Sequence, residues 1–338
     1  MKIINNLDDK SLNVLKNEIE NDNLVIFPTE TVYGIGANAL STEAVSKIFL
    51  VKERARNNPL IVHLKNKNDI EKYAVIENDI EKKLISAFMP GPFTLILKKK
   101  NNIPECVTAG LDTVGIRVPI NKLANKFLEY IDLPIAAPSA NISSRPSGTR
   151  VSDIKDEFNG LIDYIIDGGE SSIGLESTVV KVINNTPVIL RPGFITREDI
   201  ENVVGSCLVS EHVLKEVSNS LKAESPGMLY RHYAPNTKCL LVYSSDEFIL
   251  RELVKNNLCD KTIILGSNKL QDIPCLKFIN YGNSLETISH NIFSMLRECD
   301  KYDANLIIIE GVKKEGLGLA IMNRLIRTSN FNYIEKWK

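Results

Sequence analysis

The C-terminal third of the chain alternates short β-rich runs with segments of helical periodicity. The β-rich runs are KCLLVYS, DKTIILGS, LKFINYG and ANLIIIEGV, and the helical segment SLETISHNIFSMLREC separates the last two. Strands that alternate with helices pair in parallel, because each helix returns the chain across the sheet. We therefore expect residues 237–338 to form a small Rossmann-like α/β domain around a parallel sheet.

The first two-thirds of the chain also mixes strand and helix signals, in a less regular order. NLVIF (23–27) and PLIVHL (59–64) are typical of strands, whereas STEAVSKIFLVKER (41–54) begins with an N-capping serine and continues with apolar residues at helical spacing. Several further strand-like runs follow one another without regular helical spacers. The pattern predicts an α/β domain with a mixed, twisted sheet and flanking helices over residues 1–205, then a linker over residues 206–236.

Composition limits the functions open to such a chain. Its 338 residues carry a formal net charge of −1, which argues against a protein whose main activity is non-specific binding to nucleic-acid phosphates. No run approaches the roughly 18 apolar residues of a membrane span, and the start resembles no signal peptide, so we expect a cytoplasmic protein that does not contact membranes. The six cysteines form no Cys-x-x-Cys pair, which predicts buried free thiols.

Polar residues gather where predicted strands end. FPTETVYGIG (27–36) places several hydroxyl groups and Glu30 behind a strand, with Gly34 and Gly36 allowing close approach of the backbone. KERARNNPLIVH (52–63) carries cations at alternate positions, which form either a solvated charge run or a phosphate clamp. For the first segment a plain loop and a ligand-binding turn both remain open.

Further along, cations and hydroxyl groups become denser. Arg117 lies in the apolar run TVGIRVP, where it needs an anionic partner from the protein or from a ligand. APSANISSRPSGTR (137–150) has the composition of an anion-binding turn, and GLESTVV and RPG add polar residues at strand edges. The glycine loops, zinc-protease motif and serine-hydrolase motif are missing from the sequence. Arginines, hydroxyl groups and backbone N–H groups without an evident nucleophile suit phosphoryl or nucleotidyl transfer.

The predicted linker contains SPGMLYRHYAP (225–235), which is rich in aromatic and basic side chains. A flexible joint is normally short and polar. We therefore expect this linker to carry residues suited to filling a binding pocket.

The segments PTETVYGIG, NPLIVH, PGPFTLIL, SANIS, ESTVV, RPG and SPGMLYRHYAP occur in the same order as the motifs of the threonylcarbamoyl-AMP synthase family, which they resemble. The resemblance is to the long form, with a YrdC-like domain, a linker and a C-terminal domain, and it extends to GLGLAIMNRL (316–325). It implies that the linker folds back over the pocket as a lid. It implies that L-threonine, bicarbonate and ATP react to threonylcarbamoyl-AMP and pyrophosphate, with Mg²⁺ carried by the ATP. The product would pass to a tRNA threonylcarbamoyl transferase complex, for modification of the adenosine beside the anticodon; direct contact with tRNA is left open.

The resemblance also implies roles for individual residues, although none of them is an obvious general base and no catalytic residue is assigned. The residues that would hold threonine are Thr31, His63, Arg117 and Ser177, with the backbone of Ala137 nearby. The residues that would hold ATP are Lys52, Arg54, Asn58, Thr113, Ser139, Asn141, Ser147, Arg191 and Tyr233. Ala55, Arg56 and Asn57 depart from the family pattern beside the expected triphosphate contacts; the loss of a proline there loosens the loop.

Two other functions remain open at this stage. One is carbamoyl transfer from another donor, although the chain lacks the zinc-finger and acylphosphatase-like regions that accompany that activity. The other is a non-catalytic RNA-binding or translation-regulating module, which the balanced charge disfavours. In the C-terminal domain, GLGLAIMNRL favours a packing helix over a ligand site.

Overall fold

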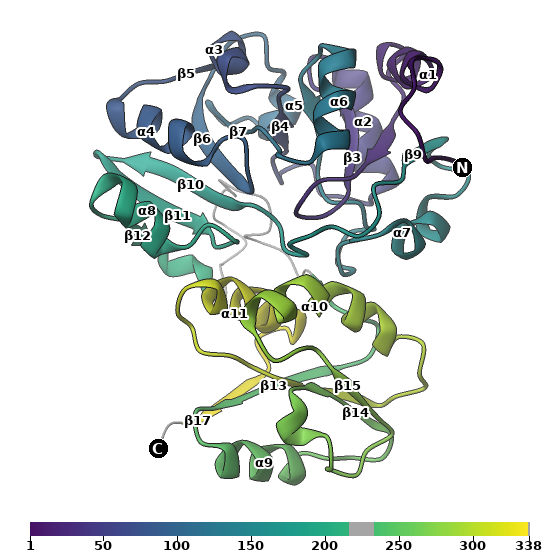
Figure 1. Ribbon diagram of the computed structural model, residues 1–338, viewed down its shortest axis with the longest axis vertical. Coiled ribbons are helices and arrows are strands. Elements are labelled where there is room, and N and C mark those ends of the chain that lie inside the picture. Colours follow the sequence, from purple (N-terminus) through teal and green to yellow (C-terminus); the bar gives the residue numbers. More distant parts are fainter. Residues whose placement is uncertain (216–232, 337–338) are drawn as a thin grey trace.

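The computed structural model describes residues 1–215 and 233–336, which form two separate β-sheets with flanking helices (Figure 1). The predicted α/β class is confirmed, with a mixed sheet in the N-terminal part and a parallel sheet in the C-terminal part. Most of the predicted lid motif, residues 225–232, lies outside the described residues.

The N-terminal sheet is mixed, since parallel pairs such as β4–β7 and β6–β10 alternate with antiparallel pairs such as β6–β7. In spatial order its strands are β1 (Lys2–Ile4), β9 (Tyr164–Ile166), β2 (Val25–Phe27), β3 (Gly34–Asn38), β8 (Ile135–Ala136), β4 (Ile61–His63), β7 (Thr113–Arg117), β6 (Phe93–Lys99), β10 (Thr178–Ile183), β11 (Thr186–Arg191) and β12 (Leu208–Val209), and β5 (Ala74–Val75) pairs with β6.

Helices cover this sheet, and one of them begins at the capping serine that the sequence predicts. They are α1 (Asp9–Glu20), α2 (Thr42–Val51), α3 (Ile70–Tyr73), α4 (Asp79–Phe88), α5 (Glu105–Thr108), α6 (Lys122–Ile131), α7 (Val151–Phe158) and α8 (Arg197–Val204). The hydroxyl of Ser41 accepts a hydrogen bond from the backbone N–H of Ala44, which fixes the start of α2.

The C-terminal sheet is parallel throughout the described residues, as the sequence predicts. Its strands, in the order β15, β14, β16, β13 and β17, are Lys277–Asn280, Thr262–Gly266, Leu306–Glu310, Cys239–Ser244 and Tyr333–Lys336. β17 was not expected, because its run is short and largely polar. The alternation of side chains along the strands gives the sheet two apolar faces: Leu241 packs on one side and Leu240 on the other.

Three helices cover these two faces. α10 (Leu285–Cys299) and α11 (Leu317–Thr328) lie between the two sheets, whereas α9 (Glu247–Asn256) covers the outer face (Figure 1). Val32 and Leu175 of the N-terminal part belong to the same apolar cluster as α10 and α11. The two parts of the molecule therefore share a hydrophobic contact.

The cysteine prediction is only partly correct. Cys207, Cys239 and Cys299 are buried free thiols, but Cys259 is exposed because it lies in the turn before β14. Within the described residues, none of the helices combines the length and the apolar character that crossing a membrane requires.

Candidate active site

A cavity opens at the carboxyl ends of the parallel strands β4 and β7, with about 740 Å³ of open space including its mouth. Open α/β sheets commonly bind ligands at this edge, where the loops that follow the strands meet. The wall also includes the turn after β2, the end of α2 and the loop after β8. The expected site residues that line the cavity are Thr31, Lys52, Arg54, His63, Arg117, Ala137, Ser139, Asn141, Ser177, Arg191 and Tyr233.

The other expected residues do not line this cavity. The backbone oxygen of Asn58 accepts a hydrogen bond from Arg54 Nε at 3.3 Å, and the hydroxyl of Ser147 donates to Glu176 Oε1 at 2.6 Å. Asn58 and Ser147 therefore contact Arg54 and Glu176, which line the cavity, without lining it themselves. Thr113 lines a smaller neighbouring cavity.

Arg117 is the central charge of one wall. Its Nη2 donates to Glu30 Oε1 at 2.6 Å and its Nη1 to Thr31 Oγ1 at 2.9 Å. Its Nε has no hydrogen-bond partner within the part of the chain that the structure describes. A buried guanidinium needs an anionic partner, and Glu30 is that partner. A ligand carboxylate in the cavity could accept a further hydrogen bond.

His63 lies beside Arg117, since the two residues are register partners on β4 and β7. Its ring packs edge-on to Phe27, with 5.9 Å between the ring centroids. Burial and the positive charge of Arg117 lower the pKa of His63 from 6.5 to about 3, so its imidazole is neutral at physiological pH. Its Nδ1 has no hydrogen-bond partner among residues 1–215 and 233–336.

Ser177 and Arg191 form another side of the wall. Arg191 Nη2 donates to the backbone oxygen of Ser177 at 2.9 Å and to its Oγ at 3.1 Å, and the same Oγ lies 2.7 Å from Thr94 Oγ1. Burial lowers the pKa of Arg191 to about 10, which still leaves it charged at neutral pH. This side of the cavity therefore presents a fixed positive charge and a hydroxyl group.

Lys52 supports the loop after β8. Its Nζ donates to the backbone oxygens of Ser139 and Asn141, each at 2.5 Å, and burial lowers its pKa well below the usual 10.5. The side-chain amide of Asn141 in turn donates to the backbone oxygens of Ile142 and Arg145. Lys52 and Asn141 thus hold the loop in shape from two directions.

Tyr233, the first described residue after the gap, belongs to the cavity wall. Its ring stacks on Phe293 of α10 with 5.1 Å between centroids, and the guanidinium of Arg324 from α11 lies 5.6 Å from the ring centroid. The next residue, Ala234, donates its N–H to the backbone oxygen of Ser144 at 2.8 Å. The end of the linker therefore touches both the C-terminal helices and the loop after β8.

Two charged residues that the sequence analysis did not single out lie at this wall. Glu176 lines the cavity, and its Oε2 accepts a hydrogen bond from Arg324 Nε at 2.9 Å. Burial raises the pKa of Glu176, but the charges of Arg324 and Arg191 outweigh it and leave the pKa below the usual 4.5. A signal for Arg324 was present, because it interrupts an apolar helix as Arg117 interrupts an apolar strand.

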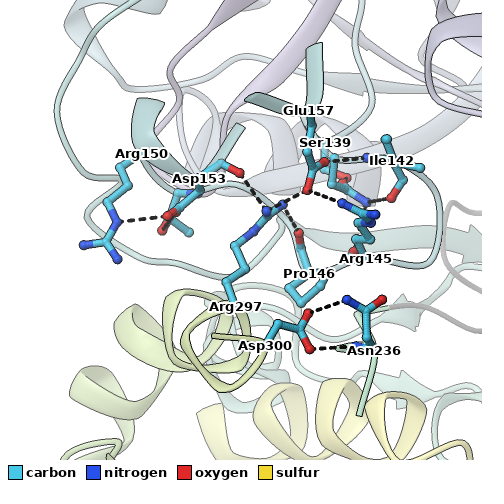
Figure 2. Close-up of polar contacts among 12 residues, drawn as sticks. Ser139, Ile142, Arg145, Pro146, Arg150, Asp153, Glu157, Asn236, Arg297 and Asp300 are labelled. Carbon is cyan, nitrogen blue, oxygen red and sulfur yellow. Dashed lines mark hydrogen bonds and ion pairs between the residues drawn. The ribbon is translucent and has the colours of Figure 1, made fainter. Parts of the chain in front are cut away.

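A second arginine from the C-terminal part contacts the loop after β8 (Figure 2). Arg297 of α10 donates to Glu157 Oε1 at 2.8 Å and to the backbone oxygens of Asp153 and Pro146 at 2.7 and 2.5 Å. The other oxygen of Glu157 accepts from the N–H of Ile142 at 3.0 Å. α10 therefore contributes to the position of this loop.

The cavity has the chemistry of a site for an anionic ligand, because arginines, hydroxyl groups and a donor-rich loop surround it. The described residues contain no group of three or more His, Cys, Asp or Glu side chains that could hold a metal ion. A divalent cation in the cavity would therefore depend mainly on oxygen atoms of a ligand, as Mg²⁺ does with nucleotide phosphates.

Known proteins resemble both parts of the chain. A family model described as "Telomere recombination" (Sua5/YciO/YrdC) matches residues 17–193, and one described as "Threonylcarbamoyl-AMP synthase, C-terminal domain" matches residues 195–329. A protein of Pyrococcus abyssi named threonylcarbamoyl-AMP synthase is 39% identical over 97% of this chain and 97% of its own length. A Bacillus subtilis protein of the same name is 39% identical over 92% of this chain and 90% of its length.

The crystal structure of Pyrococcus abyssi Sua5 in complex with L-threonine has the same fold. It superposes with a TM-score of 0.93 at 38% identity and covers 99% of this chain and 100% of that one. Both family models, the full-length relatives and the solved structure agree with the motif order in the sequence. The chain belongs to the threonylcarbamoyl-AMP synthase family, in its long form with a C-terminal domain.

Proposed function

We propose that this chain is an L-threonylcarbamoyladenylate synthase, which converts L-threonine, bicarbonate and ATP into threonylcarbamoyl-AMP, pyrophosphate and water. The observation that carries the proposal is a single cavity that gathers the expected threonine residues and most of the expected ATP residues, in a chain of this family. The product serves the N6-threonylcarbamoyladenosine modification of tRNA, through a separate tRNA threonylcarbamoyl transferase complex. The cytoplasm is the proposed compartment.

In this proposal the wall around Arg117 binds threonine. The guanidinium of Arg117, which lines the cavity, pairs with the threonine carboxylate, while Glu30 and Thr31 hold it in place. The neutral ring of His63 adds no second charge beside Arg117 and offers its Nδ1 to a polar group of the substrate. Ser177 and the backbone of Ala137 complete this side of the site.

The rest of the wall binds ATP in the proposal. Arg191 and Arg54 line the cavity and neutralise phosphate charge, and Ser139 and Asn141 line it beside them. Mg²⁺ accompanies the triphosphate and polarises its phosphoryl oxygens when bound. Tyr233 packs on the nucleotide side and restricts access of water.

The cavity promotes the reaction by confining the reactants together. The threonine amine captures the bicarbonate carbon as a carbamate with loss of water, and a carbamate oxygen attacks the α-phosphorus while pyrophosphate leaves. The carbamate is short-lived in water, so holding it against ATP in a closed cavity favours adenylation over decay.

A coupled pyrophosphate assay tests the proposal. We expect release of pyrophosphate from ATP only when threonine and bicarbonate are both present, with weaker release when serine replaces threonine. Arg117→Met should raise the KM for threonine roughly 10- to 100-fold, because the substrate carboxylate loses a charged partner. The KM for ATP should change much less. Without threonine-dependent release, a non-catalytic RNA-binding role or carbamoyl transfer from another donor would be favoured.

A further inference from the structure

Arg324 is the largest fully buried side chain of the described residues, and it comes from the C-terminal part of the molecule. Its Nε donates to Glu176 Oε2 at 2.9 Å, and its Nη1 donates to the backbone oxygen of Pro192 at 2.8 Å. Nη1 also donates to the side chain of Asn323, which is itself bound to the backbone oxygen of Val213. Arg324 thus connects α11 to two segments of the N-terminal part.

Glu176 transmits this contact to the cavity. One carboxylate oxygen accepts a hydrogen bond from Arg324, and the other accepts one from the hydroxyl of Ser147 at 2.6 Å. Glu176 is only 6% exposed and lines the cavity. Since a carboxylate with both oxygens bound has little freedom, the position of Ser147 depends on how Arg324 holds Glu176.

Arg324 also contacts the wall formed by the linker. Its guanidinium lies 5.6 Å from the centroid of the Tyr233 ring, which also stacks on Phe293. A guanidinium at this distance from an aromatic ring is attracted to it, more strongly when both are removed from water. Both are buried here.

We propose that Arg324 is a positioning residue of the active site: it fixes Glu176 and Tyr233, and through them the nucleotide side of the cavity, from the C-terminal domain. This inference rests on the proposed synthase reaction and on the assignment of Tyr233 to the nucleotide side. It gives the C-terminal domain a part in shaping that side of the cavity.

The charges around Glu176 predict that activity without Arg324 depends on pH. Among the described residues, the charged or titratable groups that face it are Arg324 from α11, Arg191 from β11, Tyr233 from the linker and Lys52 from the end of α2. Without Arg324, one of the two positive charges that oppose the effect of burial is lost, so the pKa of Glu176 rises and the carboxylate takes up a proton at a higher pH than in the unmodified protein. An ionised Glu176, and therefore full activity, would then be restricted to higher pH.

Steady-state pyrophosphate release by the full chain tests the proposal, with Arg324→Met compared with Arg327→Met as a control. Arg327 lies one turn away on α11, is also buried, and donates to the backbone oxygen of His212. We expect Arg324→Met to raise the KM for ATP roughly 10- to 100-fold and the KM for threonine by less than about threefold. Its activity should fall from pH 8 to pH 6 more steeply than that of the unmodified protein, and Arg324→Lys should retain an intermediate KM.

A double-mutant cycle shows whether the effect passes through Glu176. If it does, Arg324→Met should add little to the loss already caused by Glu176→Gln. Losses that multiply, or equal ATP KM values for Arg324→Met and Arg327→Met, would overturn the proposal. If circular dichroism shows that Arg324→Met is unfolded, the ATP KM values of Arg324→Lys and Glu176→Gln replace it in the test. Unchanged ATP KM values in both variants would overturn the proposal.

Different results would contradict the proposed reaction and the proposed role of Arg324. An unmodified protein that releases no pyrophosphate with threonine contradicts the synthase reaction. ATP affinity measured by calorimetry without threonine still reports on Arg324 in that case: it should fall in Arg324→Met and stay within about twofold in Arg327→Met. Equal affinities for these two variants contradict the positioning role.

Discussion

The charged residues of the cavity illustrate how burial and partners decide what a side chain can do. Arg117, Arg191 and Arg324 are all buried, and each donates to a carboxylate or to carbonyl oxygens. Removing one partner of such a pair leaves an uncompensated buried charge, which typically costs about 3–5 kcal/mol. Substitutions here therefore change stability as well as binding, and tests should separate the two.

His63 allows a prediction about acid stability. Because burial lowers its pKa from 6.5 to about 3, the unfolded chain binds a proton below pH 6.5 that the folded chain does not bind until about pH 3. The folded state therefore loses up to about 1.4 kcal/mol of stability per pH unit as the pH falls through this window. We expect His63→Gln to reduce this slope between pH 6.5 and 4.5, as measured by urea unfolding.

His212→Gln is the matched control, because this histidine is partly exposed and lies outside the cavity. It should leave the slope of the unmodified protein largely intact. An NMR titration gives a direct check: an imidazole signal of His63 that moves near pH 6.5 would contradict the neutral, buried ring.

At the scale of elements, the segment Ser172–Gly174 connects the site to the C-terminal part. The N–H groups of Ile173 and Gly174 donate to the backbone oxygens of Glu30 and Thr31 at 2.9 and 3.1 Å. From the other side, the hydroxyl of Ser289 on α10 donates to the backbone oxygen of Ile173 at 2.9 Å. The segment therefore holds the turn after β2 on one side and α10 on the other.

Gly174 is the position at which this arrangement is most sensitive. Its φ of +79° favours glycine, and an added Cβ would lie 2.4 Å from the backbone oxygen of His290 and 2.5 Å from that of Ser289. We expect Gly174→Ala to cost about 1–2 kcal/mol for the left-handed backbone and a further 1–3 kcal/mol for the clash with α10. Thermal unfolding and the pyrophosphate assay should both show the loss.

Gly205→Ala separates these two contributions. Gly205 has a similar φ of +87°, at the end of α8, and no atom lies within 4 Å of the Cβ that alanine would add. This variant should show the backbone cost alone and keep its activity. Equal losses for the two alanine variants would mean that the approach of α10 to Gly174 does not matter.

At the scale of the whole molecule, the N-terminal part has its own cores and shares another with the C-terminal part. Two large apolar clusters and a small one consist entirely of residues up to Val209, whereas Val32, Leu175 and Tyr233 pack into the cluster of α10 and α11. The N-terminal part thus has enough buried apolar surface to fold alone. The wall that contains Tyr233 depends on both parts.

This division predicts the behaviour of a fragment that ends at residue 210. Circular dichroism should show that this fragment is folded, because the two large apolar clusters of the N-terminal part remain complete. Its pyrophosphate release should fall by roughly 100-fold or more, since it lacks Tyr233, Arg297 and Arg324 and the nucleotide side is no longer held in place. Activity equal to that of the full chain would show that the linker and the C-terminal part do not contribute to the site.

The sequence by itself determined the local structure and the family. Strand and helix periodicity predicted the mixed and the parallel sheet, because apolar alternation depends only on neighbours along the chain. Motif order indicated the family that the comparisons confirm. The short polar strand β17 was missed, since it is defined by its partner β13 and not by its own composition.

Only the tertiary structure decided which charges meet. Arg117 and Glu30 are separated by 87 positions, and Arg324 and Glu176 by 148, so nothing in the local sequence indicates that they pair. Composition identified a donor-rich chain, but it did not show that Lys52 faces backbone oxygens or that Thr113 lies in a neighbouring cavity. The physical reason is that a buried charge is stabilised by whatever the fold places within a few ångströms of it, regardless of distance along the chain.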